Sequence, residues 1–278
     1  MICPVFTVWY KMPLKMPDLK TVLSHFDAIV TEPVMVAFSG GADSVLVLKL
    51  ALEASRDRVP IYALYADAPW MPRAARAEAE QIARELQVKL NVVSIDSPGS
   101  IGIENNPLDR CYRCKKAIFK AFMDFGQIHN VKILLEGTQL DDLTKYRPGL
   151  KAIAESGARS PLKELGLHKS DVRELLAHWG LSAAKKPSGS CLATRLPYGQ
   201  TLSVPILKQI DQAENYLRSF GFKVIRVRSH GDIARIETDL EHLSLALSKR
   251  ADIVRELKSL GWKYVTLDLE GFRSGSMD

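Results

Sequence analysis

The feature that most constrains the fold is a regular alternation, between Pro33 and about His178, of short apolar runs with longer segments of helical periodicity. The apolar runs predict buried strands at 33–38, 61–66, 90–95 and 132–137. The segments between and after them predict helices at 43–55, 73–87, 115–126 and 170–180, the last capped by Ser170 and ended by Gly180. Strands that alternate with helices predict an α/β fold, with a parallel sheet covered on both faces.

This rhythm breaks at a segment rich in Pro, Gly and Ser, Lys185–Gly199, and a different pattern follows it. A helix is predicted at 204–221, two strands of period two at 222–230 and 232–239 around a His230-Gly231 turn, a helix at 240–259 and a strand at 263–270. The order αββαβ indicates a small α+β module. We therefore expect an α/β domain at 18–185, a mobile cysteine loop at 186–199 and a small α+β domain at 200–278.

Composition bounds the class of protein. Hydrophobic residues make up 46% of the 278 residues and charged residues 25%, which is typical of a soluble chain. No apolar run reaches the ~18 residues of a membrane span, and the first twenty residues do not have the pattern of a secretory leader. We expect a cytoplasmic protein with no membrane partner. The net charge of +6 favours anionic ligands such as nucleotides and makes a nucleic-acid partner a weak expectation.

The first predicted strand runs into the segment SGGADS, residues 39–44, which we call the Ser/Gly loop. Gly40 and Gly41 can adopt positive φ and let the backbone approach a ligand, while the N–H groups of the following helix face an anion. Ser39 and Ser44 add hydroxyl donors, and Asp43 can cap the helix or help to hold Mg²⁺. The alternative is a tight strand–helix turn with no ligand. The segment is not a Walker A loop, because no Lys-Ser/Thr pair follows it.

Four cysteines are too few for a disulfide scaffold in a chain of this size. Cys111 and Cys114 have C-x-x-C spacing at the predicted start of a helix, where basic neighbours favour thiolate. With Cys191 as the only plausible third ligand, three thiolates fit a [4Fe–4S] cluster with one open iron, whereas tetrahedral zinc requires a fourth ligand. A redox pair or unlinked thiols are the alternatives, and we expect no role for Cys3.

The Ser/Gly loop resembles the PP-loop of ATP pyrophosphatases, which bind the pyrophosphate of ATP and adenylate a substrate. A more specific resemblance covers residues 33–277. It is to the LarE family, and it rests on seven segments in the same order, AFSGGADS, NPLDRCYRCK, LLEGTQLDDLTKYRPG, SPL, KPSGSCLATRLPYG, IRVRSHGDIARIE and YVTLDLEGFRSGSM.

That resemblance implies an ATP-dependent sulfur transferase of nickel-pincer nucleotide biosynthesis. Such an enzyme adenylates a carboxylate of pyridinium-3,5-biscarboxylic acid mononucleotide, releases pyrophosphate and forms a thiocarboxylate. One branch of the family sacrifices a cysteine that matches Cys191; the other has three cysteines and resembles cluster-dependent enzymes. Cys111 and Cys114 place this sequence with the second branch. The resemblance also implies that the chain forms a homo-oligomer, a hexamer, and that other proteins of nickel-pincer biosynthesis are its partners.

The resemblance assigns roles to further residues. It implies ATP contacts for the Ser/Gly loop and for Gly137 and Thr138, with Glu136 in the reaction and Asp142 assisting Mg²⁺. These residues follow a predicted strand, at the edge where parallel sheets bind ligands. It implies phosphate or substrate binding by Arg226 and Arg228, which could also lie on an exposed sheet face. Arg195 joins them as a candidate for the substrate phosphate, because the guanidinium fork suits phosphate oxygens. Glu214 and Glu237 match acidic positions linked to nickel, although two such carboxylates are more often solvated.

Two other functions remain open at this point. A tRNA thiolase also joins a Ser/Gly loop to C-x-x-C and a distant cysteine, but commonly adds zinc-ribbon cysteines or an RNA-binding domain, which this sequence lacks. A nucleotide-gated carrier of a metal or cluster would bind ATP without cleaving it.

Overall fold

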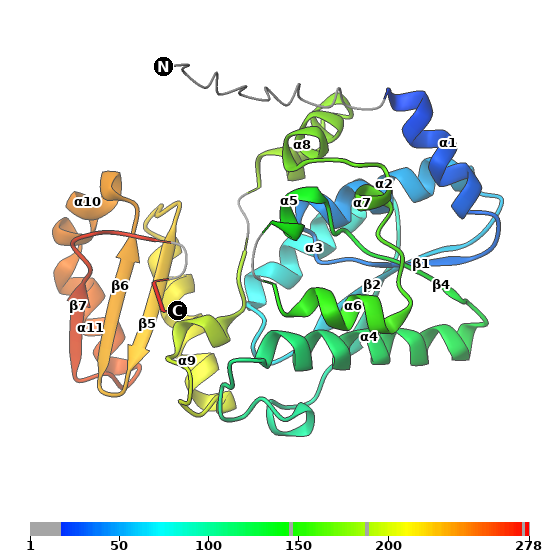
Figure 1. Cartoon of the computed structure of the whole chain (residues 1–278). Helices are drawn as coiled ribbons and strands as arrows, with labels where there is room; N and C mark the ends of the chain where they lie inside the picture. Colours follow the sequence, from blue (N-terminus) through cyan, green and yellow to red (C-terminus); the bar gives the residue numbers. More distant parts are fainter. Residues whose placement is uncertain (1–17, 145–146, 187–188, 274–275, 278) are drawn as a thin grey trace, which may run out of the picture.

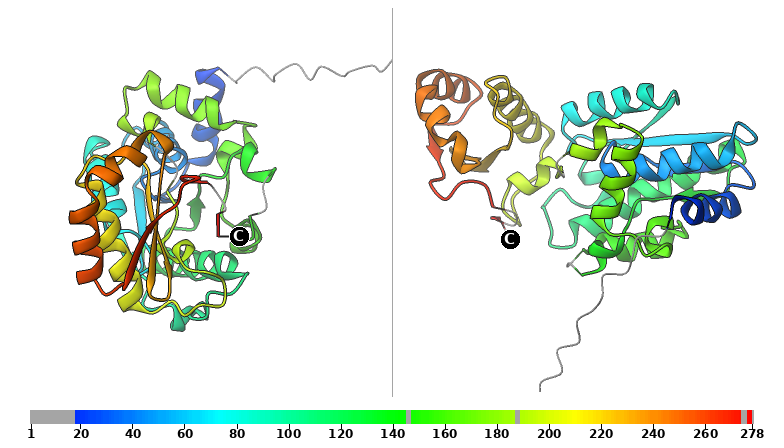
Figure 2. Two further views of the ribbon diagram at one scale, coloured as in Figure 1. Left: turned by 90° about the vertical axis from the view of Figure 1, so that its left-hand side faces the viewer. Right: turned by 90° about the horizontal axis from the view of Figure 1, so that it is seen from above.

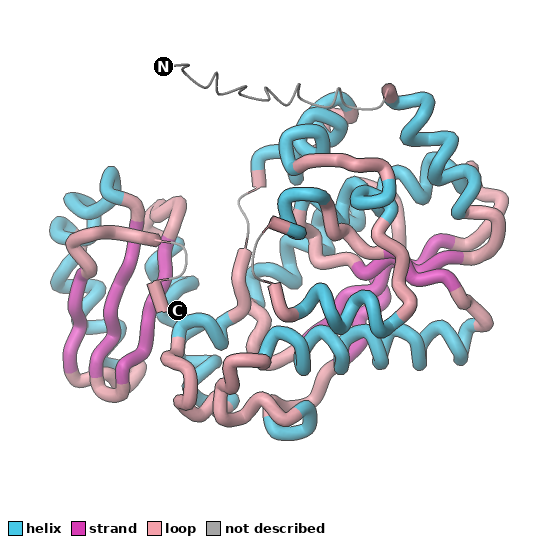
Figure 3. Tube along the Cα trace, in the orientation of Figure 1, coloured by secondary structure: helices cyan, strands magenta, loops and turns pink. Residues whose placement is uncertain are grey.

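The structure is a computed structural model, and it describes residues 18–144, 147–186, 189–273 and 276–277. Residues 1–17, which include Cys3, lie outside the described residues. The expectation that Cys3 has no role therefore stays a prediction. The chain forms a larger N-terminal unit and a smaller C-terminal unit, each with its own sheet (Figures 1 and 3).

The N-terminal sheet has four parallel strands in the order β3-β2-β1-β4. Its strands are β1 (Val34–Ala37), β2 (Ile61–Asp67), β3 (Leu90–Ser94) and β4 (Ile133–Leu135). Leu135 also bridges to Arg159, which extends the sheet beyond β4. From β1 the chain first builds the sheet on one side, with β2 and β3, and then crosses back to add β4 on the other side of β1. Ligands of open parallel sheets bind at the carboxyl ends of strands at such a point.

Helices cover both faces of this sheet (Figure 1). The apolar side chains of α1 (Leu19–Ile29), α2 (Ala42–Ser55), α3 (Arg73–Glu85) and α8 (Lys169–His178) form the core on one face. On the other face α4 (Arg110–His129) packs beside α6 (Gly149–Ser156). Short helices lie in the connections, at η1 (Gly99–Ile101), α5 (Leu140–Leu143), α7 (Pro161–Glu164), η2 (Ser182–Lys185) and η3 (Leu192–Arg195).

The C-terminal unit is a three-stranded sheet, β5-β6-β7, packed against helices. Its elements are α9 (Val204–Arg218), β5 (Ile225–His230), β6 (Ile233–Thr238), η4 (Leu240–His242), α10 (Leu243–Ser248), α11 (Arg250–Ser259) and β7 (Tyr264–Leu267). β5 and β6 are antiparallel, and β6 and β7 are parallel. Figure 2 shows this unit beside the N-terminal one. The core under α4 continues through Leu192, Ala193 and Leu196 into the C-terminal unit, so the cysteine loop contributes to the packing between them.

The α/β fold with a second small unit is confirmed. Three details of the prediction are wrong. The cap of α8 is His168 in a capping box with Asp171, so the helix begins before Ser170. The single helix at 240–259 is divided into η4, α10 and α11, with a break at Lys249. Gly40 has φ +68°, but Gly41 has φ −81° and makes no use of glycine's freedom. Within the described residues, no helix is both long and apolar enough to span a bilayer.

Candidate active site

The Ser/Gly loop lies at the carboxyl end of β1 and leads directly into α2. It is held by its own serines: the Ser39 N–H donates to Ser44 Oγ (3.2 Å), and Ser44 Oγ donates to the Gly41 carbonyl (3.0 Å). Gly41 is the N-cap of α2 and makes no side-chain capping bond. The first N–H groups of this 14-residue helix have no intrahelical partner, so they offer an anion a concentration of hydrogen-bond donors at a positive helix end.

The segment Glu136–Thr138 lies against this loop, as the sequence predicts from the neighbouring strands. A Cβ built on Gly137 would lie 2.9 Å from Ser44 N and 3.0 Å from the backbone carbon of Asp43, so only glycine fits here. Glu136 is buried and accepts hydrogen bonds from the N–H and hydroxyl of Thr138 and from the Ser160 hydroxyl. The carboxylate is therefore fixed at the edge of the site by donors on two segments.

Two lysines that the sequence analysis missed contact the Ser/Gly loop. Lys169, the first residue of α8, binds both carboxylate oxygens of Asp43, at 2.8 and 2.7 Å. Lys186 donates to the Gly40 carbonyl (3.0 Å) and pairs with Glu78 (2.7 Å). The loop thus has two ammonium groups beside it in addition to its backbone donors. Asp43 does not cap α2 but has a cationic partner.

Asp142, the predicted Mg²⁺ assistant, is buried in the first turn of α5. Its carboxylate pairs with Arg147 (2.9 Å) and accepts from the Gln139 N–H in a capping box. In this arrangement Asp142 orders the segment after Thr138.

The three cysteines of the predicted cluster come from two distant segments that the fold brings near one another. Cys111 and Cys114 lie in the first two turns of α4, and Cys191 is the N-cap of η3. The Cys114 thiol is close enough to the other two to be affected by both. Burial, followed by the influence of Cys191, raises the pKa of Cys114 to about 12. The prediction that the helix end and its basic residues favour thiolate is therefore wrong for Cys114, because its side chain packs into the core.

Trp70 connects the two cysteine segments. Its indole N–H points at Cys114 Sγ (3.3 Å), and its carbonyl accepts from the N–H of Leu192, the residue after Cys191 (2.8 Å). The ring is 1% exposed, so this contact is shielded from water. A donor aimed at a cysteine sulfur is one of the ways in which proteins tune iron–sulfur ligands.

A second connection lies on the other side of the cysteine loop. Asn106, fully buried, donates to the carbonyls of Leu196 (3.1 Å) and Pro197 (2.8 Å) and accepts from Arg110 (3.0 Å). The guanidinium of Arg110 lies over the ring of Tyr198. The segment that begins α4 and the segment that carries Cys191 are therefore held as one structure.

Arg195, a predicted phosphate ligand, is 1% exposed and has a different set of partners. It pairs with Glu214 through Nε (2.7 Å) and donates to the carbonyl of Cys191 (3.1 Å) and the hydroxyl of Ser190 (2.7 Å). Glu214 also binds Arg218 (2.8 Å), and burial, opposed most strongly by the charge of Arg195, leaves its pKa below the ordinary value. Arg195 thus fixes the backbone of the cysteine loop.

Arg226 and Arg228 share a face of β5, but that face is not exposed. Arg228 is buried, pairs with Glu237 (2.7 Å) and donates to the carbonyl of Thr194 (2.7 Å). Arg226 lies over the ring of Phe272 and has no ion pair within the described residues. Burial, and next to it the charge of Arg195, lowers the pKa of Arg226 to about 10.

Glu214 and Glu237 are fully buried, so their description as solvated charges is wrong. Each is enclosed by guanidinium groups, Glu237 by Arg228 and Arg235. As they stand, neither fits a metal site. No group of three or more His, Cys, Asp or Glu side chains in the described part of the chain is arranged to hold a metal ion. We call the set Arg195, Arg218, Arg226, Arg228 and Arg235 the arginine cluster. Its five positive charges exceed those of the three carboxylates that pair with it, Glu214, Glu237 and Asp268, and this favours an anionic ligand.

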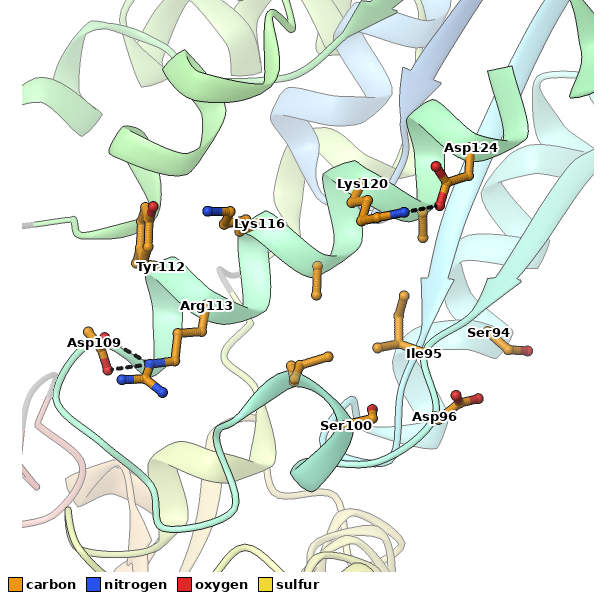
Figure 4. Close-up of a pocket in the computed structure, with 13 residues that line it drawn as sticks. Ser94, Ile95, Asp96, Ser100, Asp109, Tyr112, Arg113, Lys116, Lys120 and Asp124 are labelled. Atoms are coloured by element: carbon orange, nitrogen blue, oxygen red, sulfur yellow. Dashed lines mark hydrogen bonds and ion pairs between the residues drawn. The ribbon is translucent and has the colours of Figure 1, made fainter. Parts of the chain in front are cut away.

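A shallow depression of about 700 Å³ lies elsewhere, between the carboxyl end of β3 and α4 (Figure 4). Its charged groups are largely neutralised within it, Arg113 by Asp109 and Lys120 by Asp124. It contains neither the cysteines nor the Ser/Gly loop. The candidate catalytic and binding residues, in the Ser/Gly loop, the cysteines and the arginine cluster, therefore do not line this depression.

Comparison with known proteins places the chain in a family. No family model matches it. It is 41% identical to a pyridinium-3,5-bisthiocarboxylic acid mononucleotide synthase of Lactiplantibacillus plantarum over 246 residues, 88% of each chain. It is also 33% and 30% identical to uncharacterized proteins of Synechocystis and Methanocaldococcus jannaschii, over 88% and 87% of this chain and 91% of each relative. On the extent and identity of the first of these matches, the chain belongs to the LarE family.

Proposed function

We propose that this protein is an ATP-dependent sulfur transferase that converts a carboxylate of pyridinium-3,5-biscarboxylic acid mononucleotide to a thiocarboxylate in the biosynthesis of the nickel-pincer cofactor. The observation that carries the proposal is the set of contacts of the cysteine loop: Lys186 at its start donates to the Gly40 carbonyl, Trp70 joins it to Cys114, and Arg195 and Arg228 bind its carbonyls at Cys191 and Thr194. The name of the L. plantarum relative supports the product.

The Ser/Gly loop binds the phosphates of ATP through backbone donors, with Lys169 and the helix end offsetting their charge. Mg²⁺ bound with ATP requires only one or two carboxylates, because phosphates and water complete its shell. The Asp43 carboxylate becomes available to bind Mg²⁺ once Lys169 leaves it for a phosphate oxygen. An oxygen of the substrate carboxylate attacks the α-phosphorus, and the bond to pyrophosphate breaks.

The arginine cluster binds the nucleotide substrate at its phosphate or its second carboxylate. Arg226 is the best placed of its members, because it has no carboxylate partner within the described residues and its lowered pKa still leaves it charged at neutral pH. Arg195 and Arg228 act through the cysteine loop, whose backbone carbonyls at Cys191 and Thr194 they bind.

The sulfur step requires a nucleophile at the adenylated carbon, with AMP as the leaving group. Cys111, Cys114 and Cys191 would hold a [4Fe–4S] cluster: all three are thiols, and the Trp70 indole N–H is aimed at Cys114. As they lie among the described residues they do not yet form a metal site, so the proposal rests on their donor chemistry. A bound cluster would supply sulfide for the transfer. The alternative is that the Cys191 sulfur itself is transferred. In either case Cys191 must approach the nucleotide from η3.

The activity is tested by mixing the protein with ATP, Mg²⁺ and the dicarboxylate mononucleotide labelled with ¹⁸O in its carboxylates. We expect pyrophosphate release that requires the mononucleotide, and AMP that carries one ¹⁸O, because the carboxylate oxygen leaves with the α-phosphorus. Release that requires tRNA and stops with RNase would instead identify a tRNA thiolase. ATP that binds and is never cleaved would identify a nucleotide-gated carrier.

The sulfur source is tested by iron and acid-labile sulfide after anaerobic purification. We expect about four irons per chain, retained by the Cys3→Ser variant and lost by Cys111→Ser. Reconstitution is done above neutral pH, because the Cys114 thiol must lose its proton before it ligates iron and its pKa is raised. A native protein without iron would contradict the cluster. A chain lighter by H₂S after one turnover would then identify Cys191 as the donor.

A further inference from the structure

Phe272 is an aromatic residue that lies against the arginine cluster. The guanidinium of Arg226 lies over its ring, 5.2 Å from the ring centre. Among the described residues, no second ring has an arginine of this cluster over its face. The Phe272 side chain is only partly buried. It therefore brings an accessible, uncharged π surface to the edge of a group of five positive charges.

The ring is held at this place by backbone contacts with β6. The Phe272 N–H donates to the carbonyl of Thr238, the last residue of that strand (2.7 Å). Gly271 has φ +73°, and a Cβ built on it would lie 2.9 Å from the same carbonyl, so this close approach requires glycine. Thr238 follows Glu237, which is enclosed by arginines of the cluster. The sheet that carries the arginines therefore also fixes the ring.

Arg226 is held only by neutral partners among the described residues. Besides the Phe272 ring, it donates to the carbonyl of its neighbour Ile225 (2.7 Å). A cation over a partly exposed ring is bound weakly, whereas a guanidinium forms strong charge-assisted hydrogen bonds to phosphate or carboxylate. Burial and the charge of Arg195 lower the pKa of Arg226 to about 10, so a negative charge beside it would relieve both. An anionic group of the substrate would therefore draw Arg226 off the ring.

The proposed substrate has one feature that the arginine cluster repels. Its pyridinium nitrogen is quaternary, so the ring is positively charged at every pH, while the phosphate and the carboxylates are negative. Glu214 and Glu237 are buried and each is already bound by two arginines, so neither is available to the ring. Aromatic faces bind permanent cations of this kind, as in sites for quaternary ammonium ligands.

We propose that Phe272 forms a subsite for the pyridinium ring of the mononucleotide. As the phosphate or a carboxylate of the substrate binds Arg226, the guanidinium leaves the Phe272 ring, and the pyridinium ring stacks on the face that it vacates. The cationic ring then lies against an uncharged surface while its anionic groups bind the arginines. Phe272 thus selects a charged pyridinium ring over a neutral ring with the same substituents. This inference rests on the proposed function, because it requires the mononucleotide at the arginine cluster.

The test compares two ligands that differ in the charge of the ring. One is the dicarboxylate mononucleotide, and the other is its borohydride-reduced dihydropyridine, which keeps the phosphate and both carboxylates. Binding of each is measured by isothermal titration calorimetry with Mg²⁺ and α,β-methylene-ATP present, in the native protein and in Phe272→Leu, which keeps an apolar side chain without a π face. We expect Phe272→Leu to bind the pyridinium form about tenfold more weakly and the dihydropyridine within about twofold of native.

Two variants serve as controls. Phe272→Tyr keeps an aromatic ring and should bind both ligands as the native protein does. Phe220→Leu is the matched control, because Phe220 also has a cation over its ring, Lys249 at 5.7 Å, but that cation does not belong to the arginine cluster. This variant should also bind both ligands as the native protein does.

The outcomes separate the subsite from the proposed function. Equal weakening of both ligands in Phe272→Leu would overturn the subsite, because a ring that only holds Arg226 in place affects either anionic ligand alike. Unchanged binding of both ligands would overturn it too. In both cases the native protein still binds the mononucleotide, so the proposed function stands. A native protein that binds neither ligand would overturn the proposed substrate and the subsite together.

If Phe272→Leu does not fold, Phe272→Trp decides. Trp provides the strongest aromatic face for a cation, and an indole stacked on a pyridinium ring gives a charge-transfer absorption band that neither ring has alone. We expect this band when the variant binds the mononucleotide and none when it binds the dihydropyridine. Binding of the mononucleotide without the band would overturn the subsite.

Discussion

The Glu214→Ala variant is expected to be less stable than the native protein by about 3–5 kcal/mol. Glu214 is fully buried on α9 and accepts from Arg195 (2.7 Å), Arg218 (2.8 Å) and the Val227 N–H of the edge strand β5 (3.1 Å). Its removal leaves the equally buried Arg195 with an uncompensated charge. The measurement is the midpoint of urea denaturation followed by circular dichroism.

The difference should shrink in acid. Burial raises the pKa of Glu214, but the charge of Arg195 and the other arginines outweighs it, and the folded pKa lies below the ordinary 4.5. The carboxylate therefore contributes its full stability above pH 4.5, and this is lost as the pH falls through the lower folded value. The control is Glu241→Ala, an exposed glutamate on η4, which should change stability by less than about 0.5 kcal/mol. Equal stability of the two variants would contradict the role of the buried pair.

The strands of the N-terminal sheet could be predicted because each is a short apolar run between residues that break secondary structure. The four short helices after β4 and before the cysteine loop, such as α5 and α7, could not. They have only four residues each and too little length for a period. The divided helix at 240–259 was mistaken because its apolar residues continue across the break at Lys249.

The Ser/Gly loop was found because all of its determinants lie within six residues. Lys169 was missed because its partner, Asp43, lies 126 positions away in sequence, and no local pattern reports such a contact. Trp70 and Asn106 were missed for the same reason. The burial of Glu214, by contrast, had a signal: Leu207, Ile210 and Leu217 lie on the same face of α9, three to seven residues from it. A carboxylate on an apolar helix face indicates a buried partner.

Gly137→Ala is expected to lower the rate of mononucleotide-dependent pyrophosphate release about 100-fold while the protein stays folded. The added methyl would lie 2.9 Å from Ser44 N and 3.0 Å from the backbone carbon of Asp43. Neither atom can turn aside, because both belong to the first turn of α2, so the helix end must move away from β4. A displacement of about 1 Å in a substrate-positioning group costs about 10²-fold in rate. Steady-state pyrophosphate release measures the effect.

The matched control is Gly99→Ala, where the nearest atom to the added methyl would be Ser97 Oγ at 3.9 Å and no shift is required. Since both variants add one methyl to a glycine whose φ lies outside the left-handed region, they differ mainly in what the methyl meets. Release by Gly137→Ala within twofold of the native rate would mean that the backbone donors of α2 do not hold the ATP phosphates. Loss of pyrophosphate release in Gly137→Ala but not in Gly99→Ala would mean that the carboxyl ends of β1 and β4 act as one site. Gly137 follows β4, whereas the backbone donors that its methyl would displace follow β1.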